Sequence, residues 1–532
     1  MSGASAEATA QGRLAEERVR QEGLRRHVRG SSLLFGGRFA SLAINLGVQV
    51  LTVRYLARED YGMFAWALVV VALATQLTLL GLDTTAARFV AIYAERRDMP
   101  RVFGAIALTA GGISAASLLV GLAALAASGR LPALLGAEPA AVRVLLAMLA
   151  MAPQQSVEAV LHALFGVFGR ARSILMRRHL AGPGLKLASV LAVMALGGGA
   201  FELALAYTAS LAVGVAVYGA ALVDVLRQGG HVARWHPRRL ELPAREMLGF
   251  AASLVGAELV FMFYNSFIGM LLEYFHGAHE VAGFQAARPF AKLGDVAMVA
   301  FIHLFVPALA RFHARGDRTG VEHLYVQTSL WITLLSFPLF AVTFGMADSA
   351  AVWLLGSEYA DAGSLLAWMS AGFFVHSALG ANSQALRVLG YVRTAVAADA
   401  VAVLGALALA FLLIPGGAEH GAAATLASVL GLRGLLYLAA LRWRSGLDPL
   451  RGCGAAYAAV AAGSLLLALA RPLVAGSLVA SALVTAAVTL GVLATSRRSL
   501  ALEETFPELA RIPLLRRLLA PRGPRPDAGG PH

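Results

Sequence analysis

Long apolar segments alternate with short polar connections along this chain. Each segment holds roughly 20 or more residues, enough for a helix to cross about 30 Å of hydrocarbon. Tight turns separate neighbours, as at residues 197–199 and 415–417. The pattern predicts fourteen membrane-spanning helices, over residues 31–53, 62–82, 102–127, 140–168, 174–197, 202–226, 248–274, 281–310, 325–347, 364–386, 394–414, 420–441, 453–475 and 477–495.

The composition supports this interpretation. Apolar residues make up 58% of the chain, charged residues only 14%, and the mean hydropathy is +0.70. A soluble domain has about 25% charged residues, so the composition excludes a soluble multi-domain protein and predicts an all-α polytopic membrane protein. The first 30 residues are polar and charged. They do not form a secretory signal peptide, so we expect the first apolar segment to remain as a helix.

Basic residues fall on alternate connections. Of the 44 Lys and Arg residues, 34 lie in the two tails and in every second connection, five lie in the opposite connections and five lie within spans. Cytoplasmic loops of membrane proteins carry this excess. The net charge of +13 therefore indicates membrane orientation rather than nucleic-acid binding. We expect both termini to be cytoplasmic in a multi-pass protein of the cell inner membrane.

The chain nearly repeats itself at a shift of about 220 residues. Residues 134–138 (LLGAE) match residues 354–358 (LLGSE), and Asp98 matches Asp317. The repeated unit spans six helices, so its two copies share one membrane orientation, an arrangement found in transporters. The predicted organisation is a basic tail (1–30), an N-terminal bundle (31–226), a linker (227–247), a C-terminal bundle (248–441), a two-helix hairpin (453–495) and a cytoplasmic tail (496–532).

Several short motifs carry a family resemblance. Residues 54–56 (RYL), 60–65 (DYGMFA), 80–82 (LGL) and 86–89 (AARF) resemble the first hairpin of the Wzx-like flippases of polysaccharides and lipid-linked oligosaccharides. These belong to the multidrug/oligosaccharidyl-lipid/polysaccharide exporter superfamily. The resemblance implies a V-shaped pair of six-helix bundles around a central cavity. It also implies alternating-access movement of an undecaprenyl-pyrophosphate-linked glycan from the cytoplasmic to the outer leaflet.

The predicted helix 281–310 carries three ionisable residues on one face, Arg288, Lys292 and Asp295. A charge within a span is costly and marks a candidate functional site. Asp295 can neutralise only one of the two cations, so the surplus predicts an anion site that suits a pyrophosphate. The alternative is a set of interhelix salt bridges.

The first predicted helix adds Arg38 and Asn45 as candidate substrate-binding residues. Arg38 lies roughly 10 Å inside the cytoplasmic end, at 1.5 Å per residue. The resemblance implies that this helix and helix 281–310 face the cavity. The alternative for Arg38 is that its side chain snorkels to the interface.

Glu158 and His162 are four residues apart in the predicted helix 140–168, and Glu258 lies in 248–274. A carboxylate beside a histidine can hold a coupling proton, whereas an internal hydrogen bond explains the same pair without function. Glu258 is a further candidate for H⁺ or Na⁺ coupling. Lys186, Asp399 and Arg433 are single charges whose partners the sequence does not reveal.

Nothing in the sequence indicates covalent chemistry. It has no phosphate-binding glycine loop followed by Lys-Ser or Lys-Thr, and no His-Glu-x-x-His pattern. Cys453 is the sole cysteine, which excludes an intramolecular disulfide. We therefore expect no enzymatic activity, no catalytic residue, no metal and no cofactor. The expected partners are a lipid-linked glycan and membrane lipids, with a glycan polymerase and chain-length machinery as further candidates.

Other functions remain open at this point. A drug/cation antiporter of the same architecture would favour acidic and aromatic cavity groups, against the cations at Arg38, Arg288 and Lys292. A membrane glycan polymerase or ligase would need a sizeable outer loop, and the longest here are only about residues 128–139 and 348–363. A non-transporting scaffold is the third alternative.

The charge distribution yields a topology prediction. Alkaline phosphatase fused after Arg497 should be inactive, because an even number of spans returns this end to the cytoplasm, where the enzyme does not fold. The same fusion within residues 128–139 is the positive control. Strong activity after Arg497 would contradict fourteen spans with a cytoplasmic N-terminus.

Overall fold

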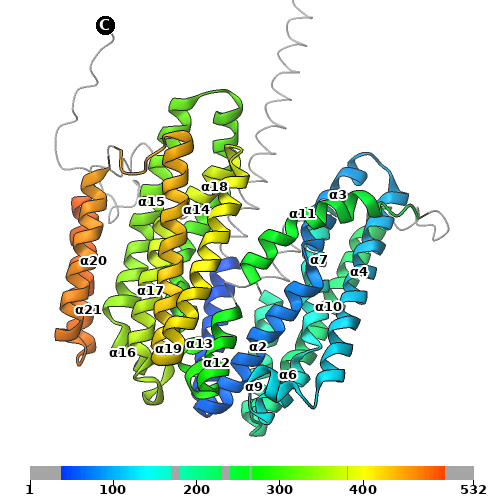
Figure 1. Cartoon of the computed structure of the whole chain (residues 1–532), viewed down its shortest axis with the longest axis horizontal. Coiled ribbons are helices and arrows are strands. Elements are labelled where there is room, and N and C mark those ends of the chain that lie inside the picture. Colours follow the sequence, from blue (N-terminus) through cyan, green and yellow to red (C-terminus); the bar gives the residue numbers. More distant parts are fainter. Residues whose placement is uncertain are drawn as a thin grey trace, which may run out of the picture. The chain divides into compact units, whose positions relative to one another are not determined.

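The computed structural model describes residues 37–168, 180–230, 240–262, 266–379, 381–451 and 453–497, and every regular element in these ranges is a helix (Figure 1). The chain divides into two compact units, with Glu258 the last residue of unit 1 and Leu259 opening most of unit 2. Leu135–Ala137 also belong to unit 2. Each unit is described by itself.

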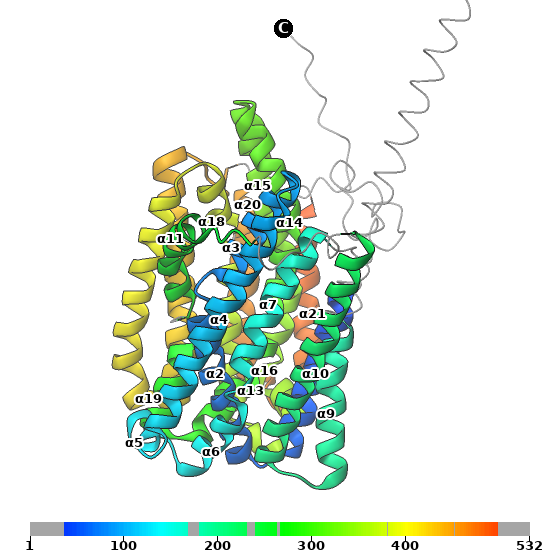
Figure 2. The ribbon, with the colours of Figure 1, turned by 90° about the vertical axis from the view of Figure 1, so that its right-hand side faces the viewer.

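Unit 1 is built from the helix over residues 37–55 and from helices up to the first part of α11. Figure 2 shows α7 between α4 and α10 in this unit. The elements are α2 (Arg58–Leu79), α3 (Leu82–Glu95), α4 (Met99–Ala127), α5 (Leu131–Leu135), α6 (Pro139–Met148), α7 (Met151–Phe168), α9 (Gly182–Leu196), α10 (Ala200–Gln228) and α11 (Ala244–Met262).

The core of unit 1 joins α3, α4, α7 and α10. Phe165 of α7 stacks on Tyr218 of α10 with ring centroids 4.4 Å apart. The start of α11 packs on α3, because Tyr93 donates to Glu246 at 3.0 Å and Arg88 lies 4.3 Å from the centre of the Phe250 ring. These contacts explain why the division falls within α11, later in the chain than the predicted linker 227–247.

Unit 2 has a core of aromatic and aliphatic side chains from α14, α15, α17, α19 and α20. Phe340 of α15 stacks on Phe374 of α17 at 4.4 Å. The elements are α12 (Ile268–His276), α13 (Ala278–Ala291), η5 (Lys292–Gly294), α14 (Asp295–Ala314), α15 (Arg318–Gly345), α16 (Ala347–Leu355), η6 (Ser357–Tyr359), α17 (Ala362–Ala378), α18 (Ala381–Val388), α19 (Val392–Ser445), α20 (Gly454–Val474) and α21 (Leu478–Thr495).

Several helices are interrupted inside the predicted spans. The span predicted over 281–310 consists of α13, the 3-10 turn η5 and α14, with Pro289 inside α13. Proline lacks an amide hydrogen, so Pro289 removes one backbone hydrogen bond from the preceding turn of α13. α19 contains Ala418 with φ 45° and ψ −129°, which breaks the helix between the two spans predicted over 394–414 and 420–441.

The internal repeat reappears in local geometry. Asp98 caps α4 by accepting from the Arg101 amide at 3.2 Å, and Asp317 caps α15 by accepting from the Gly320 amide at 2.8 Å. The residue before each aspartate is left-handed, Arg97 with φ 58° and Gly316 with φ 71°. The same helix-ending and helix-starting motif therefore occurs at both matched positions of the sequence repeat.

Ten helices among the described residues are long and apolar enough to cross a membrane. They make the chain a multi-pass integral membrane protein. The ten count α19 once although it is broken at Ala418, and they leave out the 15-residue apolar helix Gly182–Leu196. The count of fourteen stays a prediction.

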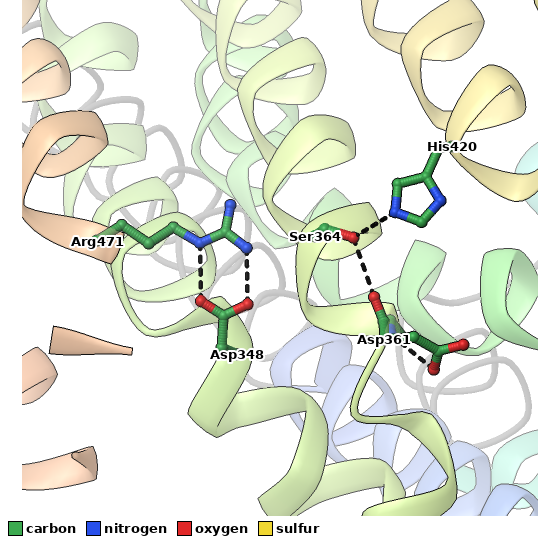
Figure 3. Close-up of polar contacts among 6 residues, drawn as sticks. Asp348, Asp361, Ser364, His420 and Arg471 are labelled. Atoms are coloured by element: carbon green, nitrogen blue, oxygen red, sulfur yellow. Dashed lines mark hydrogen bonds and ion pairs between the residues drawn. The ribbon is translucent and has the colours of Figure 1, made fainter. Parts of the chain in front are cut away.

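The α20–α21 hairpin is attached to unit 2 by close packing and by one ion pair. Gly463 of α20 lies so near Phe337 of α15 that an added Cβ would come within 3.0 Å of it. Arg471 of α20 binds Asp348 of α16 through two contacts of 3.0 and 2.7 Å, as Figure 3 shows. The pair is largely enclosed, with side-chain exposures of 19% and 32%. It fixes the hairpin to α16 at one end.

This bidentate pair yields a stability prediction. A double-mutant cycle of Arg471→Gln and Asp348→Asn, measured by chemical unfolding in detergent, should give a coupling free energy of about 1 kcal/mol. The exposed single-contact pair Arg451–Glu322, at 2.9 Å, is the matched control. We expect roughly 0.3 kcal/mol for the control pair. Equal couplings for both pairs would contradict a fixing role for Arg471.

Candidate functional site: a charged cavity and two charge clusters

Unit 1 encloses a cavity of about 460 Å³ whose wall is rich in polar side chains. It lies among the helix over residues 37–55, α2, α7, α9 and α10. The size is within the range of ligand pockets in proteins. The polar residues of the wall are Ser41, Asn45, Thr75, Gln155, Glu158, His162, Lys186, Tyr207 and Ser210.

Helix α7 supplies one wall of the cavity. Gln155, Glu158 and His162 follow one another at three- and four-residue spacing, which places them along one side of the helix. Thr75 of α2 donates to the side-chain amide oxygen of Gln155 at 3.1 Å, and the His162 ring packs 5.0 Å from that of Tyr218. Two of the three α7 side chains are thus held by neighbouring helices.

Helix α9 contributes one charged side chain, Lys186, to the cavity wall. Lys186 is the single ionisable residue of the apolar helix Gly182–Leu196, and its side chain is exposed on the cavity wall. Glu158 lies within electrostatic range of it. The sequence left Lys186 without a partner, because no local spacing relates residues on α7 and α9. A lone lysine in an apolar helix is the signal that pointed to the site.

Three of the predicted site residues therefore meet in one cavity: Asn45, Glu158 and His162. Asn45 donates to the Ser41 carbonyl at 2.7 Å within its own helix. Arg38 is exposed on the same helix but does not belong to this wall. The side chain of Glu258 lies outside the part of the chain that the structure describes.

The unit 2 candidates lie where α13 gives way to α14. Arg288 is half-buried near the end of α13, Lys292 is exposed at the start of η5, and Asp295 is 8% exposed. Asp295 accepts a hydrogen bond from Ser377 of α17 at 2.7 Å. The prediction of one straight helix face for these residues is wrong, since the 3-10 turn separates Lys292 from α13. The turn exposes Lys292 while Asp295 points into the unit.

A second cluster joins the charges that the sequence left unpaired in unit 2. The buried Asp399 accepts from Arg433 at 2.8 Å and from the hydroxyl of Tyr437, and Arg387 lies 3.6 Å away. The pairing crosses the break in α19, because Asp399 precedes Ala418 and Arg433 follows it. This network is a structural tie between the two halves of α19 and α18.

A serine–histidine pair lies near the Arg471 contact. Ser364 and His420 are hydrogen-bonded at 2.8 Å, and the Ser364 hydroxyl also contacts the Asp361 carbonyl at 3.0 Å (Figure 3). The Asp361 carboxylate accepts from the Ala362 amide. The Ser364–His420 contact ties α17 to α19. Within the described ranges, no cluster of His, Cys, Asp and Glu could hold a metal ion.

The fold matches solved membrane transporters. The lipid II flippase MurJ, in an inward closed conformation, superposes with a TM-score of 0.67 at 13% identity, covering 88% of this chain and 99% of that one. An inward-facing multidrug resistance MATE family transporter of the MOP superfamily gives 0.64 at 15%, covering 76% and 94%. The Vibrio cholerae MATE transporter VcmN gives 0.53 at 17%, covering 79% and 97%. At these identities the likeness establishes the fold.

The sequence itself gives the family. A search of curated proteins found no significant match. The family model described as polysaccharide biosynthesis protein matches residues 27–313, more than half of the chain. This confirms the resemblance noted in the first hairpin, which lies inside the matched range. The chain belongs to the polysaccharide biosynthesis protein family and has the fold of the MATE and MurJ transporters.

Proposed function

We propose that this protein is an alternating-access flippase. It moves an undecaprenyl-pyrophosphate-linked oligosaccharide or polysaccharide precursor from the cytoplasmic to the outer leaflet of the inner membrane, without covalent chemistry. The family supports the polysaccharide pathway, and the fold is shared with a protein described as a lipid II flippase. Both termini lie in the cytoplasm, and fourteen helices span the membrane.

The observation that carries the proposal is that cations are exposed within apolar helices. Arg38, Lys186 and Lys292 each lie inside a predicted span, and each has an exposed side chain. A charge facing hydrocarbon costs several kcal/mol, so an exposed cation within a span is stabilised by water, by a counter-charge or by an anionic ligand. A pyrophosphate that crosses the membrane needs fixed cations to lower its barrier. Exposed cations within spans therefore support an anionic substrate.

The fourteen-span proposal rests on the interrupted helices. Splitting α19 at Ala418 makes two segments of spanning length. The structure does not describe the residues just before the helix over residues 37–55 or residues 169–179, which precede Gly182–Leu196. It also does not describe residues 263–265, which lie between α11 and α12. Within the described residues, each predicted span contains one or more helices, and this supports the proposed count.

We propose that Arg38, Asn45, Arg288, Lys292 and Asp295 contribute to substrate binding. Glu158 and His162 are the proposed coupling site for H⁺ or Na⁺, since both line the unit 1 cavity. Glu258 is a further proposed coupling residue. Lys186 joins them, because a cation in that wall competes with a coupling ion for Glu158.

Transport of labelled lipid-linked precursor into vesicles tests the substrate site. Arg288→Ala and Arg38→Ala should each lower the rate about tenfold to a hundredfold, the loss expected when one charge-assisted contact to a phosphate disappears. Arg288→Lys should retain part of the rate because the charge survives without the bidentate fork. Asp295→Asn should be milder, because the amide oxygen can still accept from Ser377.

Arg315→Ala, an exposed arginine at the end of α14, is the matched control and should transport normally. Membrane protein level is measured for every variant. Normal transport by an Arg288→Ala, Lys292→Ala double variant would show that these cations only hold helices together. Export of a cationic dye by the same vesicles, with no movement of the precursor, would favour the drug/cation antiporter instead.

A further inference from the structure

A second cavity lies at the end of unit 2 where α14 ends and α15 begins. Its volume is about 580 Å³, and it is lined by the ends of α14, α15, α18 and α19 together with the turns that follow them. Three arginines line it, Arg318, Arg442 and Arg444, against a single carboxylate, Asp317. In the proposed orientation this end of the helices faces the cytoplasm.

Each of the three guanidinium groups is held by a contact that leaves other N–H donors available. Arg318 donates to the Ser445 carbonyl at 3.3 Å, Arg442 pairs with Asp448 at 2.7 Å, and Arg444 lies 4.3 Å from the centre of the Trp443 ring. Each contact engages one nitrogen or one face, whereas a guanidinium carries five N–H donors. Asp317 is committed to capping α15. The cavity therefore presents several donors to an anion.

The carboxylate of Asp448 pairs with Arg442 and also lies within electrostatic range of Arg451, which is outside the cavity wall. The pKa of Asp448 lies below its ordinary value: partial burial acts to raise it, but the hydrogen bonds from Arg442 and the Leu450 amide outweigh that effect. Asp448 therefore stays ionised, and Arg318 and Arg444 supply the surplus positive charge.

Among the residues that the structure describes, the cavity beside Asp98 in unit 1 does not show this surplus. The repeat relates Asp317 to Asp98, and the small cavity beside Asp98, about 240 Å³, is lined by Arg101 and Arg245 against Glu241 and Glu246. Arg101 bonds Glu241 at 3.1 Å and Asp98 at 3.5 Å. The charges that line this small cavity thus balance one another, unlike those that line the cavity beside Asp317.

Aromatic and apolar side chains at the rim indicate the depth of the cavity in the membrane. Trp443 is 76% exposed beside Arg444, and Tyr391 lines the cavity and donates to the Arg444 carbonyl at 3.0 Å. Val392 and Leu450 are also exposed next to it. Trp and Tyr gather at the headgroup level of membranes, where exposed apolar side chains meet acyl chains. If the cavity bound a soluble anion, the exposed apolar side chains around it would remain in contact with water.

We propose that this cavity binds the phosphodiester headgroup of an anionic phospholipid from the cytoplasmic leaflet. Arg318 and Arg444 bind the phosphate, and Trp443 and Tyr391 pack at the level of the glycerol backbone. Basic pockets on the cytoplasmic side of membrane proteins are suited to such headgroups. The site is separate from the proposed substrate residues and does not depend on which glycan is carried.

Binding of phosphatidylglycerol to the delipidated full chain in neutral detergent tests the proposal, with native mass spectrometry and the thermal unfolding midpoint as readouts. The double variant Arg318→Gln, Arg444→Gln should bind about tenfold more weakly than the wild type, since each arginine near the headgroups contributes to anionic lipid binding. Arg442 is kept, because removing it would leave Asp448 without its partner. The matched control is Arg311→Gln, Arg315→Gln, two exposed arginines outside the cavity wall. It removes the same charge and should bind like the wild type.

Two further arms separate lipid from soluble anion. Trp443→Ala, which keeps every charge, should weaken phosphatidylglycerol binding. Phosphatidylcholine, inorganic phosphate and glycerol phosphate should not give the saturable shift of the wild type. The same shift with inorganic phosphate, or equal lipid binding by the pocket and control variants, would overturn the proposal. If the double variant does not fold, Arg444→Gln alone breaks no ion pair and carries the same test.

Discussion

The cost of placing a charged or unsatisfied polar group in hydrocarbon is the constraint on which this structure depends. A chain with 14% charged residues has few charges to place, and those inside spans have identifiable surroundings. Asp399 is buried with Arg433 and Tyr437, and Lys186 is exposed on a cavity wall beside Glu158. Asp399 and Arg433 are kept from lipid by pairing with each other, whereas Lys186 is kept from lipid by its place in a cavity wall. Only the second arrangement leaves a cation accessible to a ligand.

Interruptions of helices influence whether a charged side chain is buried with a partner or exposed. On a continuous helix, Arg288, Lys292 and Asp295 would share one side and one environment. The 3-10 turn at Lys292–Gly294 separates them, so Lys292 becomes exposed while Asp295 turns inward to Ser377. Ser336 donates to the Gly294 carbonyl at 2.9 Å, which satisfies a backbone group at this interruption. Irregular backbone inside a membrane span is tolerated where neighbouring helices supply such bonds.

The sequence was sufficient for the features that depend on local pattern. Apolar runs located the helices, and the shift near 220 identified the paired aspartates that cap α4 and α15. It could not supply partners from distant helices, since nothing in residue spacing relates Lys186 to Glu158 or Asp399 to Arg433. It also missed the interruption after Pro289, because the hydrophobic pattern continues through it. The basic cavity was missed for the same reason: Arg318 lies 124 positions before Arg442 along the chain.

The two copies of the repeat show which features such a duplication preserves. Backbone geometry persists: the left-handed residue and the capping aspartate recur at Asp98 and Asp317, because a helix needs both whatever its surroundings. Side-chain charge does not persist. Beside Asp98 the arginines meet glutamates, whereas beside Asp317 they outnumber the carboxylate. Within the spans, unit 1 places Lys186 and Glu158 in one cavity, and unit 2 buries its Asp399–Arg433 pair. A duplicated scaffold with different charge in each copy allows the two copies to bind different partners, and this is the physical basis for proposing the coupling residues in the unit 1 cavity and a lipid site in unit 2.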